Sequence, residues 1–187
     1  WTWYGGVFRE EKGVEFPNFA VEPDPLGSVW ADWNLDPQQL EAFRRHRDGA
    51  IVGRGTLLKN GWKIGDRVTL KGTVYPVDLS FLIVGEIPSD RAPHFWFQRE
   101  YLDQALRAFT YKLSQIENAE RASLFLVDER SGELWLRVAQ GDSDAHVGLR
   151  IPLGSGIAGH VATTGRGVRI EDAYADLEGR VITLAGH

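Results

Sequence analysis

The chain has 187 residues, 43% of them apolar and 11% aromatic, which is enough to build a core in one large or two small domains and is untypical of disordered proteins. Its net charge of −5 comes from charged residues of both signs, so we expect no basic face for phosphates and no nucleic-acid partner. Cysteine is absent, which excludes disulfides, thiolate metal sites and cysteine nucleophiles.

The apolar runs of the chain are short. Those at residues 81–84 and 124–127 fall far below the roughly 18 residues that a membrane helix needs, so we expect no membrane span in this chain. The sequence opens Trp1-Thr2-Trp3-Tyr4 and lacks methionine and a basic-then-apolar leader. We therefore interpret it as a fragment whose natural start lies upstream.

The first third of the chain is predicted to hold turns, one short helix and one short strand. Residues 1–36 contain four of the seven tryptophans among glycines and prolines, a mixture typical of short extended pieces. Asp36 before Pro37 places a capping carboxylate ahead of a proline at the first helical position, which predicts a helix that ends near residue 49. Residues 50–52 then predict a brief buried strand.

The middle of the chain changes its hydrophobic period. Residues 67–70 and 77–84 alternate as strands do, which predicts a small antiparallel β unit with Trp62 buried in it and the tip at 89–93 exposed. From residue 98 to 118, apolar residues recur every three or four positions without glycine or proline, which predicts a long helix. Its expected apolar stripe, which we expect to pack on the strands that follow, is Leu102, Ala105, Leu106, Phe109, Leu113 and Ile116.

The last part of the chain predicts a partial antiparallel sheet with flanking helices. Two alternating runs, 122–128 and 133–140, are joined by a short turn with Gly132, which is typical of a β-hairpin. Further elements are expected as a strand at 149–153, a helix at 156–164, a strand at 167–171 and a helix start at 172–176. The predicted fold class is α+β: a small antiparallel β unit with short helices, a long connecting helix, and this partial sheet.

The first part of the chain carries three runs in a definite order: Gly49-Ala50-Ile51-Val52-Gly53-Arg54, residues 61–72 with Gly65-Asp66, and Phe81-Leu82-Ile83-Val84-Gly85. With residues 3–6 and 97–103 they resemble the periplasmic core domain of MacB/FtsX-like ABC transporter permeases, whose order is strand, helix, "GD-V-L" turn and strand, then a strand ending in "VVG". The resemblance covers about residues 1–106. It implies a non-catalytic domain outside the inner membrane that transmits an ATPase's motion to an exported substrate, a lipoprotein or a partner.

The second part carries other motifs, in residues 118–128, in Gly132-Glu133-Leu134-Trp135, in 151–162 and in 170–176. They are similar to the first half of a GAF domain over about residues 107–178. The resemblance implies a central antiparallel sheet flanked by helices, used in sensory proteins to bind small molecules or to dimerise. The family's later strands have no counterpart after Gly179, and the Asn-Lys-Phe-Asp-Glu motif of its cyclic-nucleotide-binding members is missing.

We therefore predict two domains, a partial permease-like region at 1–106 and a truncated GAF-like domain at 107–187. The expected function is a non-catalytic interaction and sensory module, with a small-molecule ligand at the GAF-like part, a protein partner of the transporter and a second copy of the chain as candidate partners. The first resemblance suggests the extracytoplasmic face of the inner membrane and the second the cytoplasm, so we leave the location open and expect a fragment or composite chain. The alternative function is a regulatory GAF fragment of a cyclase, kinase or phosphodiesterase whose output domain lies elsewhere.

One glycine motif formally fits a different function. The spacing Gly154-x-Gly156-x-x-Gly159 after a strand matches a dinucleotide fingerprint, which leaves a dinucleotide-binding enzyme as a third hypothesis. The helix has room for only about two turns before Gly165, too short for a βαβ crossover. We interpret the motif as a helix-entry turn that brings backbone segments close together, with Ser155 as a helix cap rather than a nucleophile.

The remaining candidate groups have weaker patterns. No two of the histidines have the spacing of metal ligands; they are His46, His94, His146, His160 and His187. The pairs Glu100/Asp103 and Asp172/Asp176 are interpreted as solvated helix faces, with acid–base chemistry as the alternative.

Trp96 between Phe95 and Phe97 could anchor a partner or pack on the β unit, and we favour packing. From all of these patterns we name no catalytic, cofactor-binding or metal-binding residue. We also expect no cofactor and no enzyme activity.

Overall fold

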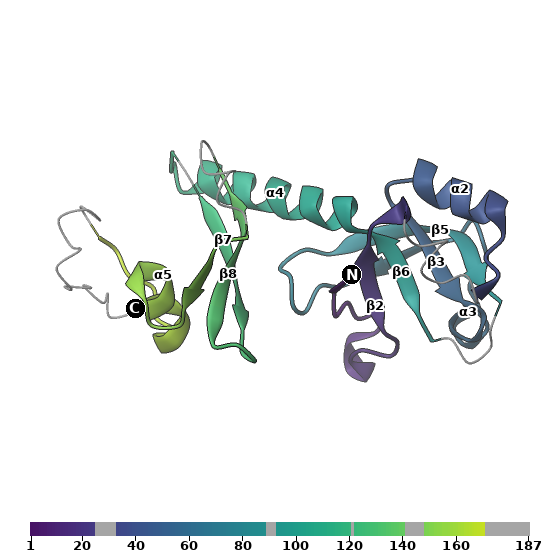
Figure 1. Ribbon diagram of the computed structural model, residues 1–187, viewed down its shortest axis with the longest axis horizontal. Coiled ribbons are helices and arrows are strands. Elements are labelled where there is room, and N and C mark those ends of the chain that lie inside the picture. The colour runs from purple at the N-terminus through teal and green to yellow at the C-terminus, as the bar shows by residue number, and fades with distance from the viewer. Residues whose placement is uncertain (25–32, 89–92, 121, 141–147, 171–187) are drawn as a thin grey trace. The chain divides into compact units, whose positions relative to one another are not determined.

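A computed structural model describes residues 1–24, 33–88, 93–120, 122–140 and 148–170 (Figure 1). The chain divides into two compact units, Trp1–Phe109 and Thr110–His187. The boundary falls inside helix α4 (Arg99–Ile116), so one helix contributes to both units. Both units combine helices with strands, and the fold class is α+β as predicted.

The first unit is built on a six-stranded mixed sheet. Its strands are β1 (Thr2–Trp3), β2 (Asn18–Val21), β3 (Gly49–Gly53), β4 (Arg67–Leu70), β5 (Leu79–Ile87) and β6 (Phe95–Gln98). They lie in the order β1-β2-β6-β3-β5-β4, with β2 parallel to β6 and β3 parallel to β5. The sheet curls, because Val7 and Lys71 exchange two backbone hydrogen bonds, of 2.9 and 2.8 Å, that connect the segments after β1 and β4.

The prediction of a small antiparallel β unit was wrong in the extent of the sheet and in the pairing of its strands. The antiparallel pair itself is present as β4 and β5, but four more strands complete the sheet. The expected strand at 50–52 is β3, and it runs parallel to β5. A parallel pair needs a crossover, and helix α3 (Arg54–Asn60) with β4 provides one between these two strands. Local hydrophobic periodicity carries no information about such pairing.

One face of this sheet is covered by helix α2 (Pro37–Arg45). The Asp36 carboxylate caps the helix by accepting a 2.7 Å hydrogen bond from the Gln38 amide, as predicted. Phe43 of α2 is fully buried against Ile51 of β3 and Trp96 of β6. The buried cluster on this face comprises Val21, Phe43, Ile51, Val84, Ile87 and Trp96.

The opposite face carries the aromatic core of the first unit. The rings of Phe81 and Phe97 lie 4.7 Å apart and those of Tyr4 and Phe97 lie 5.5 Å apart, and all three side chains are fully buried. Trp62 contacts Phe8 and Phe16 edge-on but is only half-buried, so the prediction of a fully buried Trp62 was wrong. The tip at 89–92 lies outside the described residues.

The long predicted helix is confirmed as α4, but its apolar stripe is not buried throughout. Leu102 and Leu106 are fully buried, whereas Leu113 is 43% and Ile116 76% exposed. Thr110 and Ser114, one helical turn apart, are the buried residues of the second half. The expected packing of the whole stripe on the following strands was therefore wrong. Within the described ranges, no helix is long and apolar enough to cross a membrane.

The second unit contains a three-stranded antiparallel sheet in the order β7-β8-β9. Its elements are β7 (Ser123–Asp128), β8 (Glu133–Ala139), β9 (Arg150–Pro152) and helix α5 (Gly156–Thr164). The predicted hairpin is confirmed, with Gly132 at a φ of +70° in the turn, and so are the following strand and helix. Of the strand predicted at 167–171, Val168 forms a β-bridge and its described neighbours are not in a strand, whereas residue 171 and the helix expected at 172–176 lie outside the described residues.

Candidate functional site

The glycine motif forms a tight turn at the entry to α5. The Gly154 amide donates to the Gly159 carbonyl at 3.1 Å, and the Gly159 amide donates to the Ser155 carbonyl at 3.2 Å. A Cβ on Gly159 would lie 2.9 Å from the Gly154 backbone, so the close approach requires glycine there. Ser155 occupies the cap position but its side chain makes no capping bond. The turn thus fits the structural interpretation, and α5 has only nine residues.

The three described histidines lie on different elements. His46 is exposed at the end of α2, and His160 is half-buried on α5. His94 lies in an aromatic setting, with its ring 5.5 Å from Trp33 and 5.8 Å from Trp96. Among the described residues, no three His, Cys, Asp or Glu side chains are placed to hold a metal ion. His146 and His187 lie outside the described residues.

The carboxylates singled out on α4 are arranged as surface groups. Glu100 is exposed and pairs with Arg47 at 3.5 Å, and Asp103 is half-buried. An exposed ion pair of this kind contributes little stability and is typical of a solvated helix face. The pair Asp172/Asp176 lies outside the described residues.

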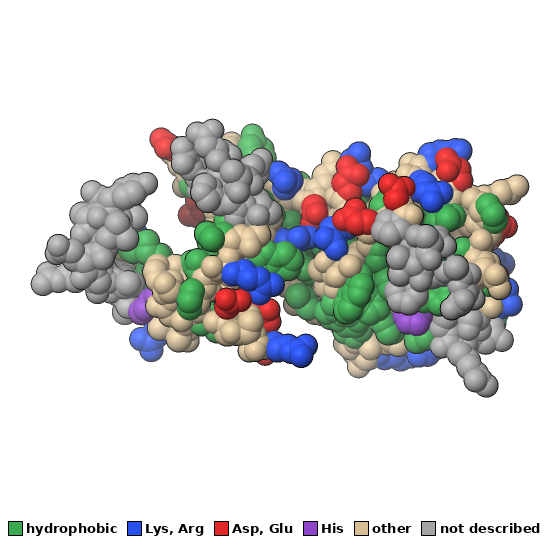
Figure 2. Space-filling view, in the orientation of Figure 1, with side chains coloured by type: hydrophobic (Ala, Val, Ile, Leu, Met, Phe, Trp, Pro, Cys, Tyr) green, Lys and Arg blue, Asp and Glu red, His purple; other side chains and the backbone are tan. Residues whose placement is uncertain are grey.

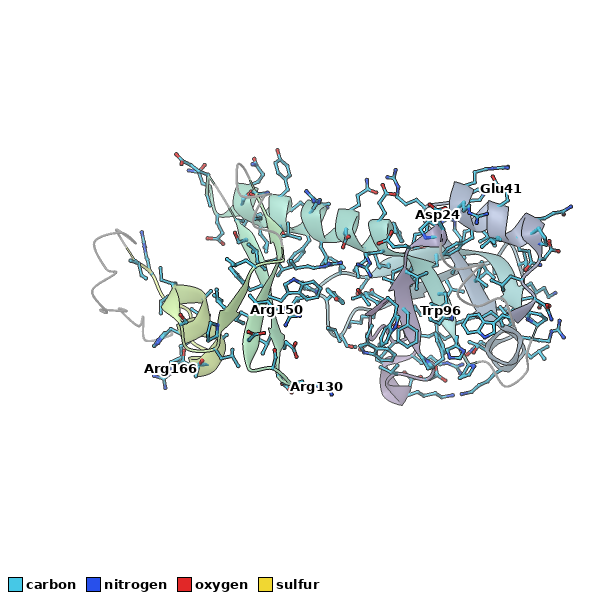
Figure 3. The ribbon with its side chains drawn as sticks, in the orientation of Figure 1. Asp24, Glu41, Trp96, Arg130, Arg150 and Arg166 are labelled. Atoms are coloured by element: carbon cyan, nitrogen blue, oxygen red, sulfur yellow. The ribbon has the colours of Figure 1, made fainter. Side chains whose placement is uncertain are left out.

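Trp96 packs inside the first unit, as favoured. It is 4% exposed, and its ring lies 5.0 Å from Phe19 on the neighbouring strand β2. Phe95 and Phe97 are fully buried on the opposite face. Figure 2 shows hydrophobic side chains gathered on the surface of the first unit, and Figure 3 shows Trp96 in the same part of that unit. At the edge of the sheet, Trp3 remains 37% exposed and its ring contacts Phe19 at 5.3 Å.

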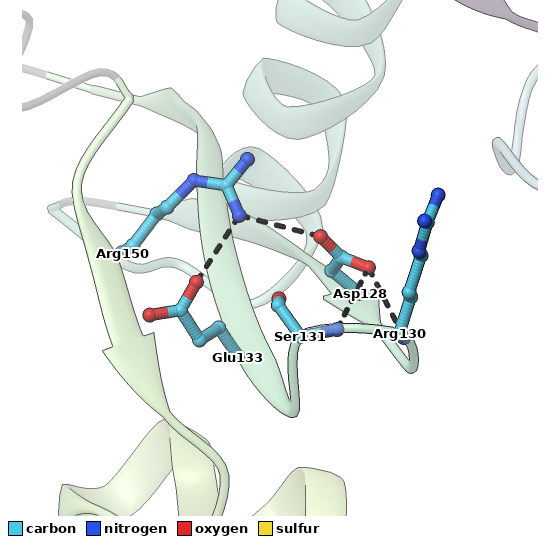
Figure 4. Close-up of polar contacts among 5 residues, drawn as sticks. All are labelled: Asp128, Arg130, Ser131, Glu133 and Arg150. Atoms are coloured by element: carbon cyan, nitrogen blue, oxygen red, sulfur yellow. Dashed lines mark hydrogen bonds and ion pairs between the residues drawn. The ribbon is translucent and has the colours of Figure 1, made fainter.

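A polar cluster in the second unit joins all three strands of its sheet (Figure 4). The Arg150 Nη1 of β9 donates to Asp128 Oδ2 of β7 at 3.3 Å and to Glu133 Oε2 of β8 at 3.2 Å. The other Asp128 oxygen accepts from the backbone amides of Arg130 and Ser131, at 3.2 and 3.4 Å. One carboxylate thus fixes the hairpin turn and the third strand at the same time.

The electrostatics of this cluster favour ion pairing over proton transfer. Hydrogen bonds from Ser131, and then from the Arg150 guanidinium, lower the pKa of Asp128. The pKa of Arg150 is raised, first by its hydrogen bond to Glu133 and then by the bond to Asp128. A carboxyl whose pKa is lowered stays ionised at neutral pH and is a poor general acid or base there. The cluster of Asp128, Glu133 and Arg150 therefore holds the three strands together, and we call it the Arg150 clamp.

Trp135 lies beside the clamp and contacts two cations. The guanidinium of Arg137 lies 5.2 Å from the Trp135 ring centre, and that of Arg150 lies 5.6 Å from it. Arg137 is also the extra residue of a bulge in β8, because Leu124 pairs with Val138 and the next residue of β7 pairs with Leu136. These contacts pack both guanidinium groups against one aromatic ring.

Sequence reasoning missed this cluster, although part of its signal was present. Asp128 and Glu133 border the predicted hairpin turn, so a four-residue turn already places them opposite each other. The position of Arg150 depends on the register of β9 against β8, where it lies opposite Trp135. A stretch of ten residues separates β8 from β9, and no local pattern fixes that register.

The chain is similar over part of its length to a known protein. No family model matches the chain. The chain is 40% identical over 72 residues to the probable 3',5'-cyclic phosphodiesterase pde-5 of Caenorhabditis elegans. The match covers 33% of this chain and 10% of that protein, so the chain corresponds to about a tenth of the relative's length.

Proposed function

We propose that the second unit of the chain is a regulatory, non-catalytic module of GAF type that belongs to a cyclic-nucleotide signalling protein. The observation that carries the proposal is the 40% identity with part of a 3',5'-cyclic phosphodiesterase. The matched stretch is 10% of that protein, which is the size of a module rather than of a whole enzyme. This function is the alternative that the sequence offered, and the similarity favours it over a transport role.

The geometry of the second unit supports the same proposal. The carboxylates Asp128 and Glu133 are engaged by Arg150, and the glycine turn before α5 closes on its own backbone. Both arrangements are contacts within the unit that serve its packing, which is what we expect of a non-catalytic module.

The proposal is tested by incubating the whole chain with cyclic AMP or cyclic GMP and divalent metal ions, with an active phosphodiesterase as the positive control. We expect no 5'-nucleotide above the rate of the buffer blank. Turnover that rises in proportion to the chain's concentration, and that is kept through repurification, would overturn the non-catalytic role. Sequencing the gene on both sides of the chain tests the regulatory role, for which we expect an enzymatic output domain.

A second proposal concerns the first unit, for which we keep the permease-type extracytoplasmic role. What supports it is the order β3, α3, the turn with Gly65-Asp66, β4 and β5, which is the order that the resemblance implies. The same gene sequence tests this proposal. Membrane helices beside an ATPase domain would support it, and a gene without either would count against it.

A further inference from the structure

Asn60 and Gly61 form a chemically reactive junction at the end of helix α3, and the sequence has no other asparagine followed by glycine. In such a pair the backbone nitrogen of the glycine can attack the side-chain carbonyl carbon of the asparagine, because glycine has no Cβ to block the approach. Water reaches the junction, since Gly61 is exposed and a Cβ placed on it would meet nothing within 4 Å. The residue pair and its exposure therefore both favour deamidation.

The hydrogen bonds around Asn60 oppose that reaction. The Asn60 Oδ1 accepts a 2.6 Å hydrogen bond from Arg9 Nη2, and the Asn60 Nδ2 donates a 2.9 Å bond to the carbonyl of Thr56. The Gly61 amide, whose nitrogen is the attacking atom, donates to the Leu58 carbonyl at 3.3 Å. The attacking nitrogen, the leaving nitrogen and the carbonyl oxygen are thus all engaged within the fold.

Arg9 is itself held in place by residues near it in the chain. Its Nε lies 3.3 Å from Glu15 Oε2, and its guanidinium carbon lies 5.3 Å from the centre of the Phe8 ring. The Glu15 side chain is only 4% exposed, so solvent screens this ion pair less than a surface pair. Arg9 and Asn60 are 51 residues apart in the sequence, so the bond between them exists only in the folded unit.

We propose that Asn60 is a latent deamidation site that Arg9 protects in the folded chain. In the reaction the Gly61 nitrogen bonds to the Asn60 Cγ and the bond from Cγ to Nδ2 breaks. The Nδ2 group leaves as ammonia, with the proton of the Gly61 amide. Water then opens the cyclic imide at either of its two carbonyls and leaves aspartate or isoaspartate at position 60. This chemistry does not depend on the proposed function.

Deamidation changes the end of α3 in charge and in backbone length. A carboxylate at position 60 cannot donate to the Thr56 carbonyl, and it adds negative charge at a helix C-terminus, where the helix dipole disfavours it. Isoaspartate adds a methylene to the backbone just before Gly61, whose left-handed φ of +70° ends the helix. The next amide, that of Trp62, donates to the Leu57 carbonyl at 2.9 Å. Keeping Asn60 intact therefore preserves the helix end that positions Trp62.

Ageing of the whole chain in warm, mildly alkaline buffer tests the proposal, and peptide mass spectrometry measures aspartate and isoaspartate at position 60. We expect the native chain to react at least about tenfold more slowly than the same chain unfolded in guanidinium chloride. The reason is that the native reaction must first break the hydrogen bonds of Asn60. Equal rates in the two states would overturn the proposal.

Removal of the guanidinium tests the role of Arg9. Arg9→Ala should raise the rate in the native chain about tenfold, because a hydrogen bond from a charged group no longer holds the Asn60 oxygen. Arg45→Ala is the matched control: Arg45 belongs to the same unit but pairs with Glu41, so the rate should stay unchanged. Circular dichroism and the urea midpoint show whether each variant is folded. A folded Arg9→Ala variant that reacts at the wild-type rate would exclude a protective Arg9.

Glu15→Gln tests the same protection without removing Arg9. This change keeps the size of the side chain but removes the charge that orients the guanidinium, so the rate at Asn60 should rise, by less than in Arg9→Ala. Where Arg9→Ala is unfolded, this variant decides the question. An unchanged rate in folded Glu15→Gln would then contradict the proposal.

Discussion

The Gln98 side chain, at the end of β6, donates a 2.9 Å hydrogen bond from its Nε2 to the carbonyl of His46 at the end of α2. The same nitrogen also donates to the carbonyl of Phe43. The Phe43 carbonyl lies in the last turn of α2, where carbonyls have no partner within the helix, whereas the His46 carbonyl also accepts from the Gly49 amide at 2.8 Å. The Gln98 amide therefore satisfies the Phe43 carbonyl and holds α2 to the sheet.

Gln98→Leu should therefore lower the free energy of unfolding by about 1–3 kcal/mol, because it leaves the buried Phe43 carbonyl without this donor. Gln115→Leu, on the exposed side of α4, is the matched control and should change it by less than about 0.5 kcal/mol. Urea unfolding followed by circular dichroism measures both. Equal stability of the two variants would contradict the capping role of Gln98.

Acid should destabilise the first unit through His94. Burial against the rings of Trp33 and Trp96 lowers the pKa of His94 below its ordinary value of about 6.5. The unfolded chain then binds a proton at His94 more readily than the folded one. The contribution of neutral His94 to the free energy of unfolding is therefore complete above about pH 6.5 and is lost as the pH falls through the folded-state pKa. Unfolding midpoints at pH 5 and pH 7.5 should differ less in His94→Phe than in wild type. An unchanged difference would show that other groups carry the pH dependence.

Along α4, the cost of truncation should follow burial. Leu106→Ala should cost about 2–5 kcal/mol as a core truncation, whereas Phe109→Ala should cost less than the 3–5 kcal/mol expected for a fully buried phenylalanine, because Phe109 is half-buried. Leu113→Ala, at 43% exposure, should be nearly neutral. Urea unfolding of the three variants ranks their losses in the free energy of unfolding. A larger loss for Leu113→Ala than for Leu106→Ala would contradict the burial pattern.

Continuity of α4 is tested by Ala108→Pro. Proline removes a helical hydrogen bond and clashes with the preceding turn, at a cost of about 3 kcal/mol or more. Hydrogen exchange of the amides of residues 106–113 should be slow in wild type and fast in the variant. Fast exchange of this stretch in the wild-type chain would mean that the two units are joined by a flexible linker instead.

At the α5 turn, Gly159→Ala should cost about 1–3 kcal/mol, because its Cβ would lie 2.9 Å from the Gly154 backbone. Gly167→Ala is the matched control, since its Cβ would meet nothing within 4 Å and its backbone is not in the left-handed region. The control should be neutral or slightly stabilising. The measurement is the unfolding midpoint of each variant, and an equal loss at both positions would contradict the close approach.

The elements that could be predicted from the sequence are those with local signals. Asp36-Pro37 marked the start of α2, the three- and four-residue spacing marked α4, and Gly132 marked the hairpin turn. Pairing between distant segments could not be predicted, because nothing local connects β2 with β6 or sets the register of β9. The Arg150 clamp depends on that register and was missed for the same reason.

The position of β6 has a consequence for synthesis of the chain. β6 lies between β2 and β3 and is the last strand of the first unit to leave the ribosome. Until it emerges, β2 lacks the strand that joins it to β3, although the segment after β1 can already pair with the segment after β4 through Val7 and Lys71. Pairing of β2 with β6, which packs Phe19 against Trp96, is therefore delayed by more than seventy residues of translation between Val21 and Phe95. Long-range pairing of this kind slows folding, and during that wait the nascent chain is most vulnerable to aggregation.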